Sequence, residues 1–231
     1  MTRFPALRRT AFAAALLGSI ALPSAVMAQA TAETSYSIPQ DRIAGLADFV
    51  DGVMAQQIAT REVAGAIVTV VYRDKVLFSR GYGFADIDKG IAVDGQQTLF
   101  RPGSVSKMFT WSALLQQVEA GRVDLDKDVN TYLDFQIPEF EGKPIRVRDL
   151  MSHTPGMSDV GGLTAPTPDK ITPYVEWMKT HIPVRHWAPG TETSYSNYGS
   201  VLAGYIVERV SGEAFPDYVE KHIFAPLGMT S

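Results

Sequence analysis

The alternation of apolar and polar positions predicts that the chain begins with one helix and a hairpin. Between residues 41 and 58, apolar residues recur at helical spacing, which predicts an amphipathic helix whose apolar face needs a covering element. Residues 66–72 are rich in β-branched side chains, residues 73–75 form a polar turn, and residues 76–82 return to an extended pattern. This order predicts a β-hairpin directly after the helix.

After Thr98 the pattern changes to helices joined by loops that are rich in proline and glycine. Apolar residues at helical spacing from Val105 to Val118 predict a helix that stops at Gly121. Residues 157–169 predict a loop long enough to be functional or mobile. Further helices are predicted at 146–152, at 198–210, at 215–222, and from Pro173 onward with Thr172 as the N-cap.

The predicted hairpin leaves a sheet unfinished. A two-stranded hairpin is only marginally stable by itself, and no stretch after Thr98 has the pattern of a convincing strand. We therefore expect further strands of the sheet to follow Ser231.

Residues 1–28 show the features of a secretory signal peptide in the required order. Three arginines among the first nine residues precede an apolar run at 11–22 that is too short to span a bilayer. The alternative is an N-terminal core helix. A signal peptide followed by a linker at 29–40 predicts export, so we expect a periplasmic or secreted protein. No later apolar run reaches the roughly 18 residues of a transmembrane helix, so membrane attachment would require such helices in a continuation past Ser231.

Composition and charge narrow the class of protein. The chain has 231 residues, of which 45% are hydrophobic and 20% charged, and a formal net charge of −4. These values fit one large globular domain or two small ones. The charges are interspersed and no basic stripe carries interleaved aromatic residues, so we expect no nucleic-acid partner. The absence of cysteine excludes disulfides, thiol nucleophiles and zinc–thiolate sites.

The first motif that carries chemistry is an S-x-x-K sequence formed by Ser104 and Lys107 within the predicted helix. Residues three apart on a helix share one face, at about 5 to 6 Å between Cβ atoms, so Lys107 can bring its amine to the hydroxyl of Ser104. Pro102 and Gly103 place Ser104 at the helix start, where unpaired backbone N–H groups favour an oxyanion. The motif predicts a serine nucleophile with a neighbouring base.

The second motif is a Y-x-N sequence formed by Tyr195 and Asn197. A phenol beside a lysine is a plausible general base in one half-reaction and general acid in the other. The planar amide of Asn197 offers a donor and an acceptor that can align a substrate amide. Together the two motifs predict an acyl-transfer site.

Structural roles remain open for each of these residues. Ser104 could instead cap a helix, and Lys107 could be a solvated side chain. Tyr195 could be a half-buried packing residue, and Asn197 could be the N-cap of the helix that follows it.

The acidic and histidine residues do not form a metal-binding pattern. Asp124, Asp126, Asp128 and Asn130 alternate as in a calcium loop, but Val129 occupies the position that requires glycine. A solvated turn fits this stretch better. The four histidines lack the spacing of a zinc site. We expect neither a metal nor an organic cofactor.

Longer stretches around both motifs resemble the serine hydrolases related to class C β-lactamases, penicillin-binding DD-peptidases and their esterase relatives. The resemblance covers about Arg42 to Ser231 and rests on the motif-bearing stretches 100–107, 153–157, 189–197 and 226–229. It implies that Ser104 is the acylated nucleophile, Lys107 its base partner, Tyr195 the proton shuttle and Asn197 the ligand of the substrate amide.

The same resemblance implies an α+β, multi-domain fold of the β-lactamase/transpeptidase type. In this fold an antiparallel sheet is flanked by helices and joined to an all-α region. Residues 41–103 would supply the helix and hairpin of the α/β domain, and residues 104–231 the helical region. The expected partner is a small-molecule or peptide substrate that contains an amide or ester.

The chain departs from the family in one respect. The third motif, a Lys-Thr-Gly or His-x-Gly on a sheet strand, is absent from the sequence, and so is a candidate for the water-activating glutamate of class A enzymes. Three functions therefore compete: an exported serine hydrolase, a penicillin-recognising module that is acylated without turnover, and a non-catalytic fragment.

Overall fold

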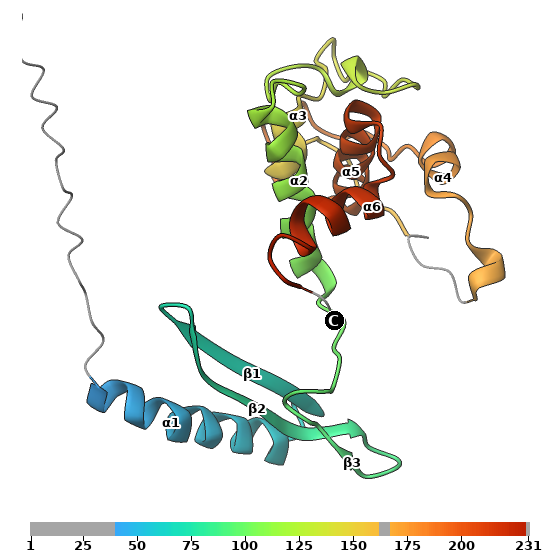
Figure 1. The fold of residues 1–231 in the computed structure, drawn as a ribbon. Coiled ribbons are helices and arrows are strands. Elements are labelled where there is room, and N and C mark those ends of the chain that lie inside the picture. The colour runs from blue at the N-terminus through green and yellow to red at the C-terminus, as the bar shows by residue number, and fades with distance from the viewer. Residues whose placement is uncertain (1–39, 162–166, 230–231) are drawn as a thin grey trace, which may run out of the picture. The chain divides into compact units, whose positions relative to one another are not determined.

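The computed structural model describes residues 40–161 and 167–229, which form two compact units divided between Thr98 and Leu99 (Figure 1). The predicted division, after Gly103, lies slightly later in the chain. The predicted signal peptide, 1–28, and the predicted linker, 29–40, lie outside the described residues except for Gln40. None of the helices in the described ranges is long and apolar enough to cross a membrane.

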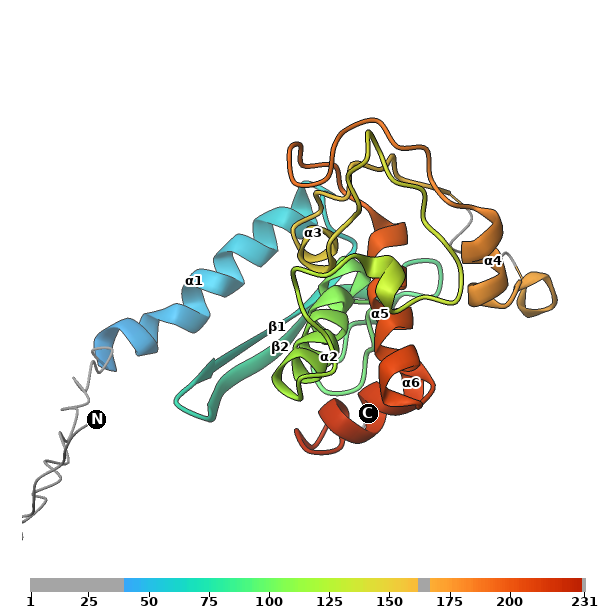
Figure 2. The ribbon, with the colours of Figure 1, turned by 90° about the horizontal axis from the view of Figure 1, so that it is seen from above.

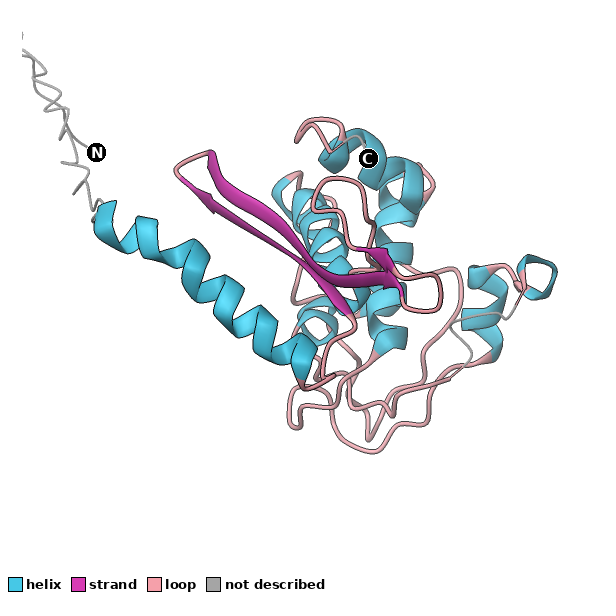
Figure 3. Cartoon of the chain, turned by 90° about the horizontal axis from the view of Figure 1, so that it is seen from below, coloured by secondary structure: helices cyan, strands magenta, loops and turns pink. Residues whose placement is uncertain are grey.

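The first unit contains the predicted helix and hairpin. Helix α1 spans Gln40–Ala59, and strands β1 (Gly65–Tyr72), β2 (Lys75–Asp86) and β3 (Ile91–Ala92) form an antiparallel sheet in the order β1-β2-β3. Helix α1 runs along the hairpin (Figure 3). The helix and hairpin are confirmed, whereas β3 was not predicted because two residues are too few to show a periodicity.

Polar side chains tie α1 to the sheet in addition to apolar packing. Asp51 of α1 forms an ion pair with Arg80 of β2, and the hydroxyl of Tyr82 donates to Asp51 Oδ1 at 2.7 Å. The hairpin turn places Arg73 and Asp74 at φ values of 48° and 61°, as a tight turn with the twist of the flanking strands requires.

The second unit is helical within its described residues. Its helices are α2 (Lys107–Glu119), α3 (Val147–Met151), α4 (Tyr174–Thr180), α5 (Asn197–Ser211) and α6 (Phe215–Val219), with a π-helical turn at Glu220–Phe224 and 3₁₀ turns at Gly103–Ser106, Val129–Thr131 and Pro168–Lys170. Helices α2 and α5 pack side by side (Figure 2). Leu114, Leu202 and Ile206 are fully buried in the core that these helices share.

Two details of the predicted helices were wrong. The α-helix after Pro102 begins at Lys107, because Gly103 has a φ of 55° and the chain then makes a 3₁₀ turn before the α-helical path starts. Thr172 does not cap α4. Pro173 is the N-cap, since its ψ of 128° keeps it in an extended conformation outside the helix.

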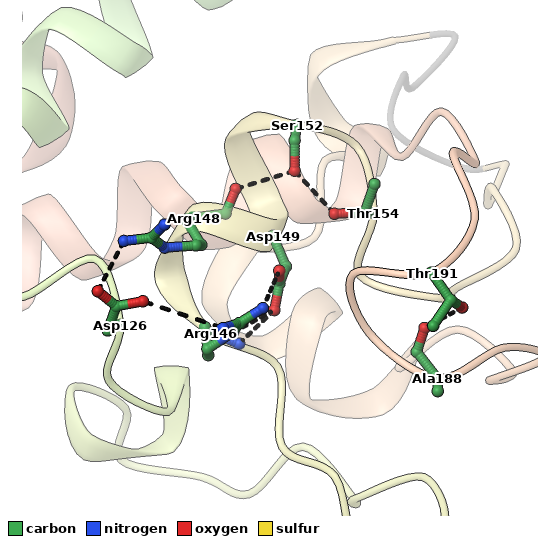
Figure 4. A network of polar contacts seen from close by, with 8 residues as sticks. All are labelled: Asp126, Arg146, Arg148, Asp149, Ser152, Thr154, Ala188 and Thr191. Atoms are coloured by element: carbon green, nitrogen blue, oxygen red, sulfur yellow. Dashed lines mark hydrogen bonds and ion pairs between the residues drawn. The ribbon is translucent and has the colours of Figure 1, made fainter.

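A network of charged side chains fixes α3 and the turn that leaves it (Figure 4). The buried carboxylate of Asp149 accepts from the backbone N–H of Arg146 at 2.9 Å and pairs with the guanidinium of the same residue. Arg148 donates to Asp126 at 2.6 Å. Beyond the helix, the hydroxyls of Ser152 and Thr154 lie 2.7 Å apart. The network therefore anchors the turn at 153–159, which contacts the functional site described next.

Candidate active site

The structure brings the four predicted site residues together within the second unit. Lys107 Nζ donates to Ser104 Oγ at 3.1 Å and to Asn197 Oδ1 at 2.7 Å. The hydroxyl of Tyr195 donates to Ser104 Oγ at 2.6 Å, and Lys107 Nζ lies 4.7 Å from the centroid of the Tyr195 ring. Ser104 is exposed, so its hydroxyl combines two polar partners with access from solution.

The alternative structural roles do not fit this geometry. Ser104 lies inside the 3₁₀ turn and makes no capping hydrogen bond, because Pro102 is the N-cap of that turn. The N-cap of α5 is Ser196, whose hydroxyl accepts from Gly199 N at 3.0 Å, so the side chain of Asn197 is not used as a cap. Tyr195 is 45% exposed and therefore partly covered, but its hydroxyl donates to Ser104 Oγ, a contact that a packing role alone does not explain.

The turn at 153–159 holds the Tyr-Ser-Asn segment by its backbone. The N–H of Ser194 donates to the carbonyl of His153 at 2.8 Å, and the N–H of Ser196 donates to His153 Nδ1 at 3.3 Å. Because Nδ1 accepts this hydrogen bond, the imidazole is neutral with its proton on Nε2. The ring also lies 4.4 Å from the Tyr195 ring, centroid to centroid.

Asp159 is a site residue that the sequence analysis missed. Its carboxylate accepts from the backbone N–H of Asn197 at 3.1 Å and from Asn197 Nδ2 at 3.0 Å. The residue lies in the predicted loop 157–169, whose sequence has no periodicity to indicate where a side chain points. The only available signal was a carboxylate shortly after a tight turn.

Nearby charges and burial shift the ionisation of two side chains in the site. Contact with the ammonium of Lys107, followed by the hydrogen bond with Ser104, lowers the pKa of Tyr195 below that of a free phenol. Burial, followed by the positive charge of Lys107, lowers the pKa of His153. The phenol is thus easier to ionise at this position, and the imidazole is kept neutral.

A cavity of about 500 Å³ opens beside Ser104. Its volume falls in the range of small-molecule sites, about 300 to 1,000 Å³. The lining combines polar side chains, among them Ser104, Lys107 and Asn197, with apolar ones, among them Val201, Phe215 and Pro216.

No cluster of three or more potential metal ligands occurs among the residues that the structure describes. The acidic stretch that resembled a calcium loop forms local contacts instead. Asp124 accepts from the N–H of Asp126 at 2.8 Å, and Asp128 caps the 3₁₀ turn at 129–131 by accepting from Asn130 N at 2.9 Å.

Comparison with known proteins identifies the family of the chain. The family profile described as Beta-lactamase matches residues 50–231. The chain belongs to the beta-lactamase family. A beta-lactamase of Yersinia enterocolitica is 30% identical over 204 residues, which cover 83% of this chain and 48% of the relative.

Two solved members of the beta-lactamase fold support the same assignment. EstCE1, described as a hydrolase with promiscuous acyltransferase activity, is 25% identical with a TM-score of 0.71 over 81% of this chain and 53% of its own. The D-amino acid amidase of Ochrobactrum anthropi SV3, complexed with L-phenylalanine amide, is 29% identical with a TM-score of 0.68 over 80% of this chain and 51% of its own. The predicted α+β fold of the β-lactamase/transpeptidase type is confirmed. The chain spans about half the length of these beta-lactamase-family relatives.

Proposed function

We propose that the protein is an exported serine hydrolase that cleaves an amide or ester through an acyl-enzyme on Ser104. The observation that carries this proposal is the position of Ser104 Oγ, which lies 3.1 Å from Lys107 Nζ and 2.6 Å from the hydroxyl of Tyr195. The predicted signal peptide at 1–28 supports export to the periplasm or the medium.

The position of Lys107 beside the phenol favours Tyr195 as the base. Lys107 Nζ lies within hydrogen-bond distance of Ser104 Oγ and Asn197 Oδ1, and 4.7 Å from the centroid of the Tyr195 ring. An ammonium in this position stabilises the phenolate of Tyr195, which is consistent with the lowered pKa of that residue. In this scheme Lys107 keeps its proton and Tyr195 exchanges one.

The reaction proceeds in two half-reactions with balanced proton transfers. Ser104 Oγ attacks the substrate carbonyl while the Tyr195 phenolate accepts the hydroxyl proton. Tyr195 then gives that proton to the departing amine or alcohol, and an ester to Ser104 remains. A water molecule attacks this ester and passes a proton to Tyr195, which returns it to the oxygen of Ser104 as the acid leaves.

The cavity indicates which part of the substrate the described residues would hold. Its apolar part, lined by Val201, Phe215 and Pro216, suits a hydrocarbon or aromatic substituent next to the scissile carbonyl. The relatives include proteins described as a beta-lactamase, a hydrolase with promiscuous acyltransferase activity and a D-amino acid amidase. We propose that the substrate is a β-lactam, a D-alanyl peptide or a small ester that carries such a substituent.

Active-site labelling tests the proposal. A fluorophosphonate probe and a fluorescent penicillin should each label the wild-type protein, and Ser104→Ala should abolish labelling. Ser112→Ala is the matched control, because Ser112 is an exposed serine of α2, the helix that follows the 3₁₀ turn of Ser104. The hydrogen bond found for its side chain goes to the carbonyl of Met108. Labelling that persists in Ser104→Ala would refute the assignment of the nucleophile.

Burst kinetics with the fluorescent penicillin separate turnover from binding alone. A steady rate after the burst indicates a hydrolase. A stoichiometric burst followed by almost no further product would instead support the penicillin-recognising module, and an unlabelled wild-type protein would support the non-catalytic alternative.

A further inference from the structure

Asn197 is held on two sides in the active site. Its amide oxygen accepts from Lys107 Nζ at 2.7 Å, and its amide nitrogen donates to Asp159 Oδ2 at 3.0 Å. The backbone N–H of the same residue donates to Asp159 Oδ1 at 3.1 Å. One carboxylate therefore contacts both the main chain and the side chain of Asn197.

An asparagine amide has a carbonyl oxygen that accepts hydrogen bonds and an NH₂ group that donates them. Rotation about the last side-chain torsion exchanges the positions of these two groups. If the amide of Asn197 were reversed, its NH₂ group would meet the ammonium of Lys107, so that two donors would face each other. Its carbonyl would at the same time face the carboxylate of Asp159, and two acceptors would meet. The acidic side chain thus decides which end of the amide faces Lys107.

We propose that Asp159 is a positioning residue for the attack of Ser104 on the substrate carbonyl. It orients the amide of Asn197 and, through that amide, the ammonium of Lys107. This inference rests on the proposed hydrolase function. Asp159 acts through Asn197 and makes no contact of its own with Ser104 among the hydrogen bonds of the described residues.

The arrangement also leaves a donor for substrate. The NH₂ group of Asn197 carries two hydrogens, and Asp159 accepts one of them. The second remains available to a substrate carbonyl at the cavity that Asn197 lines. By fixing the amide, Asp159 directs this hydrogen as well as the oxygen that contacts Lys107.

Nuclear magnetic resonance can test this positioning without any activity. The chain contains only two asparagines, Asn130 and Asn197, so selective ¹⁵N-asparagine labelling gives two side-chain NH₂ pairs. In Asp159→Ala, the Asn197 side-chain pair should move toward the shifts of a free amide, and the backbone signal of Asn197 should move too. The Asn130 pair is the internal control, because Asn130 bonds to Asp128 and Ile137 instead.

A second variant separates the orientation of the amide from support of the helix start. Asp159→Asn keeps an oxygen for the backbone N–H of Asn197 but opposes an NH₂ group to the side-chain amide. It also adds a third side-chain NH₂ pair, which is recognised because the wild type lacks it. It should shift the side-chain pair of Asn197 and leave the backbone signal near its wild-type position. An Asn197 side-chain pair that is unchanged in both variants would overturn the proposal.

A double-mutant cycle on the rate of fluorophosphonate labelling tests the catalytic consequence. Asp159→Ala and Asn197→Ala should each slow labelling by about tenfold or more, and the double variant should be no slower than Asn197→Ala. Multiplicative effects would show that Asp159 does not act through Asn197 and would overturn the proposal. If the wild-type protein is not labelled at all, the proposed function fails, and the resonance experiment alone decides the role of Asp159.

Discussion

Replacing Gly156 with alanine should loosen the turn at 153–159 and displace the Tyr-Ser-Asn segment that the turn holds. Gly156 has a φ of 74°, and a Cβ at this position would lie 2.0 Å from the carbonyl oxygen of Trp187. Because that oxygen belongs to the backbone, no side-chain rotation relieves the contact. One of the two chain segments must move.

The expected loss of stability follows from separate contributions. A left-handed conformation costs a non-glycine residue about 1 to 2 kcal/mol. Moving the backbone also weakens the hydrogen bond from His186 N to Gly156 O, which measures 2.9 Å, and a bond of this kind contributes about 0.5 to 1.5 kcal/mol. The sum predicts that Gly156→Ala lowers the free energy of unfolding by about 1.5 to 3.5 kcal/mol.

Gly121→Ala is the matched control. Gly121 has a φ of 70°, but beyond its chain neighbours no atom of the described residues lies within 4 Å of the position that the new methyl group would take. This variant should therefore lose only the conformational contribution of about 1 to 2 kcal/mol. The comparison isolates the effect of the close approach between Gly156 and Trp187.

Urea titration followed by tryptophan fluorescence measures both variants. All three tryptophans, Trp111, Trp177 and Trp187, lie in the second unit, so the signal reports on the part of the chain that contains the site. Gly156→Ala should also slow fluorophosphonate labelling, whereas Gly121→Ala should not. Equal losses of stability in the two variants would refute the reasoning.

Three further predictions follow from the site and its supports. Lys107→Met removes the ammonium that lowers the pKa of Tyr195, so the phenol should titrate at higher pH. Tyrosine absorbance, compared with that of a Tyr195→Phe reference, measures this titration, and an unchanged midpoint would contradict the prediction. The pKa of His153 is lower in the folded state than the unfolded value of about 6.5, so its contribution to stability is complete above pH 6.5 and is lost as the pH falls below it. Urea midpoints at pH 7.5 and 5.5 should therefore differ more in the wild type than in His153→Gln, and an equal difference would exclude this role. Asp149→Ala should lower the free energy of unfolding by about 1 to 3 kcal/mol, because a buried, hydrogen-bonded carboxylate is lost. Asp126→Ala should lower it by under about 1 kcal/mol, because that carboxylate is exposed. Similar losses for the two variants in thermal unfolding would show that burial is not the cause.

The sequence predicted the elements whose periodicity extends over many residues. Helices α1 and α5 and the hairpin carry long apolar patterns, and their bounds were predicted to within a few residues. The final helix was predicted as one element, but α6 ends at Val219 and continues as a π-helical turn to Phe224. A single apolar stripe does not distinguish these two forms.

The proximity of Ser104 and Lys107 was predicted correctly from a helix type that was wrong. The S-x-x-K spacing was read on an α-helix, whereas Ser104 lies in a 3₁₀ turn. In a 3₁₀ helix, residues three apart are eclipsed, so the hydroxyl and the amine still meet. The proximity of Tyr195 to Ser104 was predicted from the resemblance and from the chemistry of the Y-x-N motif. Residues so far apart in sequence have no local pattern that relates them.

The supports of the site could not be predicted. His153 and Asp159 act from an irregular turn, where the direction of each side chain depends on tertiary contacts that no periodic pattern records. His153 has a φ of 55°, a conformation that is uncommon for residues other than glycine. That conformation is stable only because the surrounding hydrogen bonds hold the turn in place.

Ser196 sits between the two functional side chains of the Y-x-N motif, is fully buried, and accepts the hydrogen bond that starts α5. The middle position is therefore not interchangeable in this protein, although the motif notation leaves it undefined. A randomised library at codon 196, selected for folded and active clones, should retain mainly residues that are small and can accept from a helical N–H, such as serine, threonine, aspartate and asparagine. Substitutions meant to alter the proposed substrate preference are better directed to the cavity wall than to the buried centre of the motif.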